Sequence, residues 1–216
     1  MITLSDMGSA LMTVWKRCAA VFLFLLAMPV HAQNILLVGD SISAAFGLEI
    51  SEGWGSLLEQ RLTDEGYPHS VINASVSGDT TAGGLARLPG LLEEFEPELV
   101  IIELGGNDGL RALPLENMQQ NLSAMVSLSQ QAGADVILLG MMIPPNYGPR
   151  YADGFAQVFH QVAEERDVTL VPFLLEGVGG VEGMMQDDGV HPTAAAQPLL
   201  LDNAWPAIRL WLDSIE

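Results

Sequence analysis

Five short apolar runs, each followed by a stretch with helical character, constrain what this chain can fold into. The runs are apolar throughout instead of alternating with polar residues, which indicates strands buried on both faces of a sheet. They occupy residues 34–39, 69–74, 98–104, 134–141 and 168–173. The helical stretches cover about 53–66, 80–95, 115–132, 150–166 and 193–213. Such alternation predicts a parallel sheet with helices on both faces, and the absence of a linker or repeat predicts one α/β domain over residues 33–216.

The first 32 residues have a different character. Lys16 and Arg17 precede the apolar run CAAVFLFLLAMPV (18–30), which is followed by HAQ, and Val30 and Ala32 fit the small-residue positions before a cleavage site. A basic start, a short apolar run and small residues before a cut are typical of a secretory signal peptide, so we predict cleavage after Ala32. The run is shorter than the ~20 residues that a spanning helix needs, although an uncleaved N-terminal anchor is the alternative. The signal peptide predicts a periplasmic or secreted protein without stable membrane insertion.

Loss of residues 1–32 would change the charge and the thiol content of the protein. Cys18 is the only cysteine, so the remaining chain would have no disulfide and no thiol nucleophile. Six arginines would face 26 acidic residues. This strongly negative field disfavours binding to nucleic acid or to an anionic membrane surface. It also leads to the hypothesis of a salt-tolerant protein, because salt screens the repulsion between acids.

Polar segments follow the predicted strands at the positions where an open parallel sheet binds its ligands, beyond the carboxyl ends of the strands. The segments are GDS (39–41), SVSGDTTAGG (75–84), GGNDGLR (105–111), IPPNYG (143–148) and, further along the chain, DDGVHP (187–192). We therefore expect all of them to lie on one rim of the sheet.

His191 is the histidine of this rim, and it has an acid close by. Asp188 lies three residues before it, and a tight turn can fold this carboxylate back onto the imidazole Nδ1–H. Such a contact fixes the tautomer and favours the imidazolium that forms when Nε2 takes a proton. The alternative is a turn aspartate next to a capping histidine. His69 and His160 are expected to be structural.

Ser41 has two possible roles, as a helix cap after a buried strand or as a nucleophile. At the start of a helical turn, free N–H groups would favour developing negative charge. A serine hydroxyl needs a base because its own pKa is far above neutrality, and His191 can supply one through Nε2. The surrounding GDSIS is not the G-x-S-x-G elbow of the α/β-hydrolases.

Acyl transfer to Ser41 would also need hydrogen-bond donors that face the oxyanion. Gly78 can bring its backbone N–H close because glycine has no Cβ, Asn107 offers a side-chain amide, and Ser41 offers its own N–H. Taken singly, Gly78 would be interpreted as a turn glycine and Asn107 as a loop asparagine. Together they predict an oxyanion hole on three adjacent strand ends.

Ser41, Gly78, Asn107 and His191, in this order, resemble the four landmarks of the SGNH (GDSL-type) hydrolases. GDSIS differs from the usual serine block only by Ile42, where leucine is common. The longer runs NASVSGDTTAGGLARLP, IELGGNDGLR, MMIPPNYG and DGVHPTAAAQP resemble the periplasmic thioesterase/lysophospholipase/arylesterase branch of that family. The resemblance covers nearly all of residues 34–210.

This resemblance implies a three-layer α/β/α sandwich of the flavodoxin-like kind, with a five-stranded parallel sheet. It implies a triad of Ser41 as nucleophile, His191 as acid and base, and Asp188 as the residue that orients it. Ser41, Gly78 and Asn107 are then the oxyanion donors, and no metal or cofactor is expected. The implied substrates are carboxylic esters and acyl thioesters, including aryl esters, lysophospholipids and fatty-acyl esters, and the expected state is a monomer.

Several alternatives remain open at this point. A glycan or small-metabolite O-deacetylase would use the same triad. A metallophosphoesterase would need several histidines and carboxylates around two metals, and a binding module without catalysis would be expected to lack a triad residue. A secreted, acidic enzyme would also be poorly placed to meet the anionic acyl carriers of the cytosol.

A long acyl chain would need an apolar groove. The loops after the third and fourth strands supply possible walls for it, namely Leu110, Leu113, Ile143, Pro144 and Tyr147.

Overall fold

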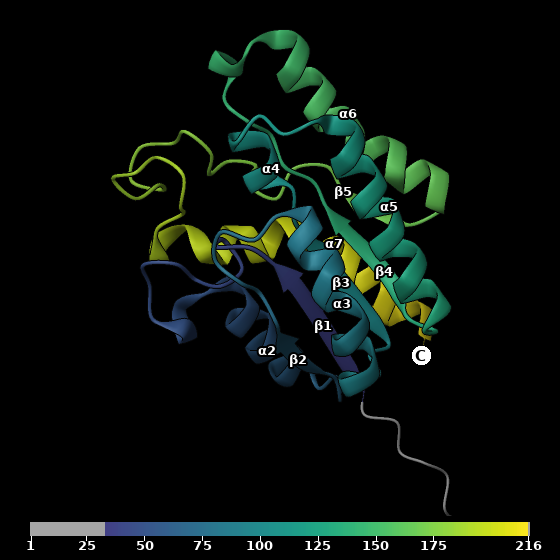
Figure 1. Cartoon of the computed structure of the whole chain (residues 1–216). Coiled ribbons are helices and arrows are strands. Elements are labelled where there is room, and N and C mark those ends of the chain that lie inside the picture. Colours follow the sequence, from purple (N-terminus) through teal and green to yellow (C-terminus); the bar gives the residue numbers. More distant parts are fainter. Residues whose placement is uncertain (1–32, 216) are drawn as a thin grey trace, which may run out of the picture. The chain divides into compact units, whose positions relative to one another are not determined.

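The computed structural model describes residues 33–215, so the predicted signal peptide lies outside the described residues. Five parallel strands form one sheet in the order β2-β1-β3-β4-β5 (Figure 1). The strands are β1 (Asn34–Gly39), β2 (Ser70–Asn73), β3 (Leu99–Glu103), β4 (Asp135–Leu139) and β5 (Thr169–Val171). The predicted five-stranded parallel sheet is confirmed.

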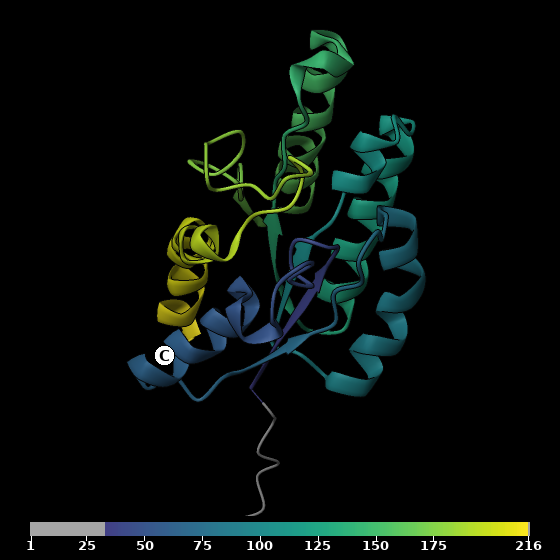
Figure 2. The same cartoon turned by 90° about the vertical axis from the view of Figure 1, so that its left-hand side faces the viewer.

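Helices cover both faces of this sheet, as Figure 2 shows. On one face α2 (Trp54–Glu65) packs against α7 (Gln197–Ile215). On the other face α5 (Leu115–Gln131) lies between α3 (Thr81–Phe95) and α6 (Pro149–Arg166). The result is the expected three-layer α/β/α sandwich. Shorter helical pieces are η1 (Ile50–Glu52), α4 (Gly106–Leu110), η2 (Pro145–Tyr147) and η3 (Ala194–Ala196).

The strand order fixes where a ligand site can form. From β1 the chain runs outward to β2 and then returns to place β3 on the other side of β1. This reversal opens a crevice beyond the carboxyl ends of β1 and β3, the position where open α/β sheets bind ligands. The segments that follow these two strands contain Ser41 and Asn107.

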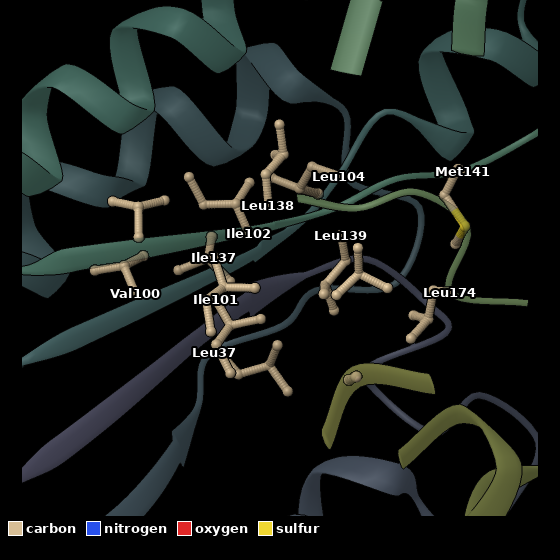
Figure 3. Close-up of a cluster of buried hydrophobic side chains, with 14 of the residues drawn as sticks. Leu37, Val100, Ile101, Ile102, Leu104, Ile137, Leu138, Leu139, Met141 and Leu174 are labelled. Atoms are coloured by element: carbon tan, nitrogen blue, oxygen red, sulfur yellow. The ribbon is translucent and has the colours of Figure 1, made fainter. Parts of the chain in front are cut away.

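The central strands form the core of the sandwich, and Figure 3 shows their side chains packed together. All five residues of β3 are buried, as are the last five of β1. Leu37, Ile101 and Ile137 are among the side chains that meet there. Their burial, worth roughly 25 cal/mol for each Å² of apolar surface, supplies the main driving force for the fold.

The edge strands depart from the prediction of burial on both faces. Ser70 and Asn73 of β2 and Thr169 of β5 are exposed, because a strand at the edge of a sheet has a neighbour on only one side. The strands β2 to β5 are also shorter than the predicted apolar runs, and α7 begins at Gln197 because η3 forms the preceding turn.

Local sequence explains how the helices start and stop. The apolar residues Trp54, Leu58 and Leu62 recur every four residues along α2 and are all buried. Gly66 then ends the helix in the left-handed conformation, with φ of 83°. At the start of α3 the Thr80 side chain caps the helix by accepting the N–H of Gly83.

Within residues 33–215, no helix has both the length and the apolar character that a crossing of the membrane requires.

Candidate active site

Ser41 lies in a tight turn at the end of β1. The turn spans residues 41–47 and is held by hydrogen bonds from the Ala44 N–H to the Asp40 carbonyl and from the Phe46 N–H to the Ser41 carbonyl, both 3.0 Å long. Ser41 thus lies at the start of a single helical turn, as expected, but no helix continues from it. Ala45 adopts φ of 55°, a left-handed conformation that stops helical winding after one turn, so no helix dipole acts on Ser41.

Three side chains form a continuous chain of hydrogen bonds at this turn. His191 Nε2 lies 2.9 Å from Ser41 Oγ, and His191 Nδ1 lies 2.7 Å from Asp188 Oδ2. The other carboxylate oxygen of Asp188 accepts the backbone N–H groups of Val190 (2.9 Å) and His191 (3.0 Å). These bonds fold residues 188–191 into a tight turn that holds the imidazole next to Asp188. His191 contacts Ser41 although the two residues are 150 positions apart in the sequence.

The carboxylate of Asp188 sets the tautomer of His191. The hydrogen bond from the His191 ring, followed by those from the two backbone N–H groups, lowers the pKa of Asp188 to about 2. The carboxylate is therefore ionised at neutral pH and holds the ring proton on Nδ1. This tautomer leaves the Nε2 lone pair free to accept the O–H of Ser41.

Two backbone N–H groups next to the serine are free to meet a ligand. Among residues 33–215, no acceptor lies within hydrogen-bond reach of the Ser41 N–H or the Gly78 N–H. Gly78 adopts φ of 80° in the loop after β2, a conformation that disfavours any side chain. Its carbonyl is held by Arg111 Nη2 at 2.8 Å, which fixes the orientation of this peptide.

Asn107 lies on the short helix α4, an element that the sequence did not reveal. The neighbouring Asp108 anchors this helix to the start of α3 by accepting both the N–H (2.9 Å) and the hydroxyl (2.6 Å) of Thr81. Gly109 allows close packing, since a Cβ there would lie 2.6 Å from Phe155 and 2.7 Å from Ile143. Gly109 is therefore required for close packing. The sequence suggested that Asn107 lies in a loop, whereas it lies in a helix.

The side chain of Asp40 is a partner of Asn107 that sequence reasoning missed. Asp40 is 2% exposed; its Oδ2 accepts Asn107 Nδ2 at 3.0 Å and its Oδ1 accepts the Ile42 N–H at 3.1 Å. Burial raises the pKa of Asp40 to about 6, although the hydrogen bonds from Ile42 and Asn107 act in the opposite direction. An amide has two N–H hydrogens, so one remains free on Asn107. The only sequence signal was the position of Asp40 directly after a buried strand.

Glu103 braces the serine turn from beneath and is fully buried. Its Oε2 accepts the hydroxyl of Ser43 at 2.7 Å and the N–H of Asp40 at 3.3 Å, while Oε1 has no partner among the described residues. Burial, reinforced by the nearby charge of Asp40, raises the pKa of Glu103 well above its usual value. The signal in the sequence was an acid at the end of the apolar run LVIIE.

Arg87 joins the loop of Gly78 to the end of β1. From α3 its Nε donates to Asp79 Oδ2 at 2.8 Å, and its other nitrogens donate to the carbonyls of Ala74 and Gly39. A planar guanidinium with five donors suits a junction of this kind. Arg87 was also absent from the sequence-based site.

An apolar cavity of about 310 Å³ borders these groups. Its walls include Ile42 and Val190, the chain neighbours of Ser41 and His191, together with three of the five wall residues expected from the sequence: Leu110, Ile143 and Pro144. Leu113 and Tyr147 are not among the lining residues. Unpredicted walls come from Met141, Met142, Phe173 and Met185.

The other two histidines among residues 33–215 lie apart from this site. His69 is buried just before β2, at the opposite end of the strands, where its ring packs edge-on against Trp211 at 5.2 Å. His160 is exposed on α6. Within the described part of the chain, no three His, Cys, Asp or Glu side chains are grouped as metal ligands would be.

Comparisons with known proteins agree with this architecture. Esterase TesA of Pseudomonas aeruginosa is 59% identical over 187 residues, which cover 87% of this chain and 93% of that protein. Thioesterase 1/protease 1/lysophospholipase L1 of Escherichia coli (strain K12) is 41% identical over 192 residues, 88% of this chain and 90% of that protein. A crystal structure of TesA matches with a TM-score of 0.81 and 60% identity, covering 82% of this chain and 98% of the other.

A family model also matches the greater part of the chain, residues 37–198, and includes both the serine turn and the Asp188–His191 turn. With this match and the relatives above, the chain belongs to the GDSL-like lipase/acylhydrolase family.

Proposed function

We propose that this protein hydrolyses carboxylic esters and acyl thioesters through an acyl-enzyme on Ser41. The observation that carries the proposal is the hydrogen-bond chain from Ser41 Oγ through His191 to Asp188, with distances of 2.9 Å and 2.7 Å. Membership in a lipase/acylhydrolase family supports the same reaction class.

In the first half of the reaction, Ser41 Oγ attacks the carbonyl carbon of the ester while its proton passes to His191 Nε2. Asp188, ionised and bonded to Nδ1, stabilises the resulting imidazolium. The C–O bond to the alcohol (the C–S bond in a thioester) then breaks, and His191 returns the proton to the leaving group. In the second half, water replaces the alcohol and the same steps release the acid and restore Ser41.

The negative charge that develops on the carbonyl oxygen needs donors in place before the reaction. The N–H groups of Ser41 and Gly78 have no other acceptor among the described residues, and Asn107 has one amide hydrogen to spare. We assign these three groups to the oxyanion hole, where loss of one donor costs about 3 kcal/mol of barrier.

The apolar cavity beside the triad supports an acyl chain as its occupant. Methionine and aliphatic side chains form its walls, which suits a fatty-acyl or other apolar acid. Relatives named as an esterase and as a thioesterase and lysophospholipase are consistent with this range. A periplasmic or secreted monomer, free of its first 32 residues, would meet lysophospholipids and other esters rather than cytosolic acyl carriers.

Hydrolysis of p-nitrophenyl esters from acetate to palmitate tests the proposal with wild type and Ser41→Ala, each with and without a chelator. We expect chelator-resistant turnover that falls by at least about a thousandfold in Ser41→Ala, while circular dichroism shows the fold intact. Full activity of Ser41→Ala would refute the mechanism. A preference for acetate alone, without longer chains, would favour the deacetylase alternative.

A further inference from the structure

Phe46 is a large apolar side chain that lies against His191 and still meets solvent. The centroid of its ring is 4.4 Å from that of the imidazole, and the two planes are inclined by 33°. Nevertheless the side chain is 49% exposed. A phenyl ring that is half exposed loses much of the free energy that burial would provide, so its position needs another explanation.

The backbone holds Phe46 in this place at a cost. Ala45 before it has φ of 55° and Gly47 after it has φ of 77°. A left-handed conformation costs a residue with a side chain roughly 1 kcal/mol, and such strain concentrates at functional sites. A Cβ on Gly47 would lie 2.5 Å from Gln186 Oε1, so the glycine is also needed for close packing.

Two hydrogen bonds complete the clamp on Phe46. Its N–H donates to the Ser41 carbonyl at 3.0 Å, and its carbonyl accepts Gln186 Nε2 at 2.8 Å. Gln186 also donates to the Pro192 carbonyl at 3.0 Å, next to His191. The backbone of Phe46 is therefore tied to both the serine turn and the histidine turn.

The position of the ring relates it to one half of the substrate. Phe46 is not a wall of the apolar cavity, so two separate apolar surfaces border the triad. His191 is the group that gives its proton to the departing alcohol, which must therefore lie beside the imidazole. The ring in contact with that imidazole faces the same space.

We propose that Phe46 forms the binding site for the alcohol half of the ester and selects planar, aromatic alcohols, an inference that rests on the proposed hydrolysis at Ser41. The exposed part of the ring offers its face or edge to a phenyl or benzyl group, a contact that adds to the burial of apolar area. The cavity lined by Leu110 and Ile143 then holds the acyl half.

The test compares benzyl and ethyl butanoate, two esters of the same acid whose alcohols have similar acidity. We expect Phe46→Ala and Phe46→Leu to lower the benzyl-to-ethyl ratio of kcat/KM by about threefold to tenfold, mainly through KM. Leucine keeps an apolar cover on His191 and removes only the aromatic surface. Competitive inhibition by benzyl alcohol should weaken in the same proportion.

Ile50→Ala is the matched control, because Ile50 is a large apolar side chain of η1, four residues further along the same segment, and is 76% exposed. Its benzyl-to-ethyl ratio should equal that of the wild type. Equal losses on both esters in the Phe46 variants would mean that the ring only orients the imidazole, and would overturn the inference. The inference would also be overturned if the Phe46 variants changed the preference for acyl-chain length and left the preference between the two alcohols unchanged. Absence of turnover of either ester by wild type would refute the esterase proposal itself.

Discussion

At the scale of single residues, the proposed oxyanion role of Asn107 depends on how its amide is held. In the structure its Nδ2 donates to the buried carboxyl group of Asp40 at 3.0 Å. During acyl transfer the second amide hydrogen would meet the oxyanion. The bond to Asp40 holds the amide plane fixed, so the donor is in place before the negative charge appears, which is the condition for electrostatic stabilisation of a transition state.

Replacement of Asn107 tests this role. Asn107→Ala should lower kcat by roughly a hundredfold or more and leave KM within a few fold, because the oxyanion exists only in the transition state. Steady-state kinetics on p-nitrophenyl butanoate provide the measurement. Asn34→Ala is a suitable control, since Asn34 Nδ2 is also hydrogen-bonded, to the Phe95 carbonyl at 2.9 Å, but lies at the other end of β1. An unchanged kcat in Asn107→Ala would remove this residue from the oxyanion hole.

At the scale of elements, the order of strands and long helices along the chain could be predicted from the sequence. A strand buried on both faces of a parallel sheet has a continuous apolar sequence, which is easy to recognise. β1 matches its predicted range residue for residue, and the central β3 differs by one residue at each end. Short elements at the site were not predictable in this way. The helix α4 depends on contacts of Asp108 with Thr81, 27 residues away, and on close packing at Gly109.

The end of the serine turn could not be predicted from the sequence for a related reason. A helical turn was expected after the first strand, but nothing in GDSISAA marks Ala45 as the residue at which helical winding stops. In the fold, Ala45 takes a left-handed conformation, which carries Phe46 over to His191. The partners of Glu103 and Arg87 come from distant segments, so their roles at the site could not be predicted from local sequence, even though Glu103 stands out as an acid at the end of an apolar run.

The buried acid at the end of β3 gives a prediction on stability and pH. Glu103 has a pKa raised well above 4.5 in the folded protein, so the folded state binds its proton more tightly than the unfolded chain does. Its contribution to stability is therefore fully present below the unfolded pKa and is lost as pH rises through the folded pKa. The loss amounts to roughly 1.4 kcal/mol for each pH unit between the two values.

Glu103→Gln removes this titration and keeps the shape of the side chain. We expect the free energy of unfolding of the variant, relative to wild type, to increase steadily as pH rises from about 5 to 8. Urea unfolding at several pH values measures the difference. Glu94→Gln is the control, because Glu94 is exposed near the end of α3, so this variant removes an acid that is not buried. A constant difference for Glu103→Gln would show that Glu103 has a similar pKa in both states.

At the scale of the whole molecule, the charge is strongly unbalanced. The sequence carries a formal net charge of −19. Few arginines in residues 33–215 are placed to neutralise exposed acids: Arg61 pairs with Asp202, and Arg209 approaches Glu65 and Asp213. Arg87 pairs with Asp79 inside the site, and Arg111 binds the Gly78 carbonyl. Most of the acids are therefore left to repel one another across the surface.

Salt should consequently stabilise this protein. The range of electrostatic repulsion falls from about 30 Å at 0.01 M salt to about 3 Å at 1 M, while the hydrophobic core is not weakened by sodium chloride. We expect the midpoint of thermal unfolding to rise by several degrees over this range, and ester hydrolysis to persist at 1 M.

The double variant Glu93→Gln/Glu94→Gln removes two exposed acids at the end of α3, far along the chain from the serine turn. It should melt higher than wild type in low salt and gain less from added salt, because it has less repulsion to screen. A midpoint that falls as salt is added, or an equal gain in wild type and variant, would show that the acidic surface does not limit stability.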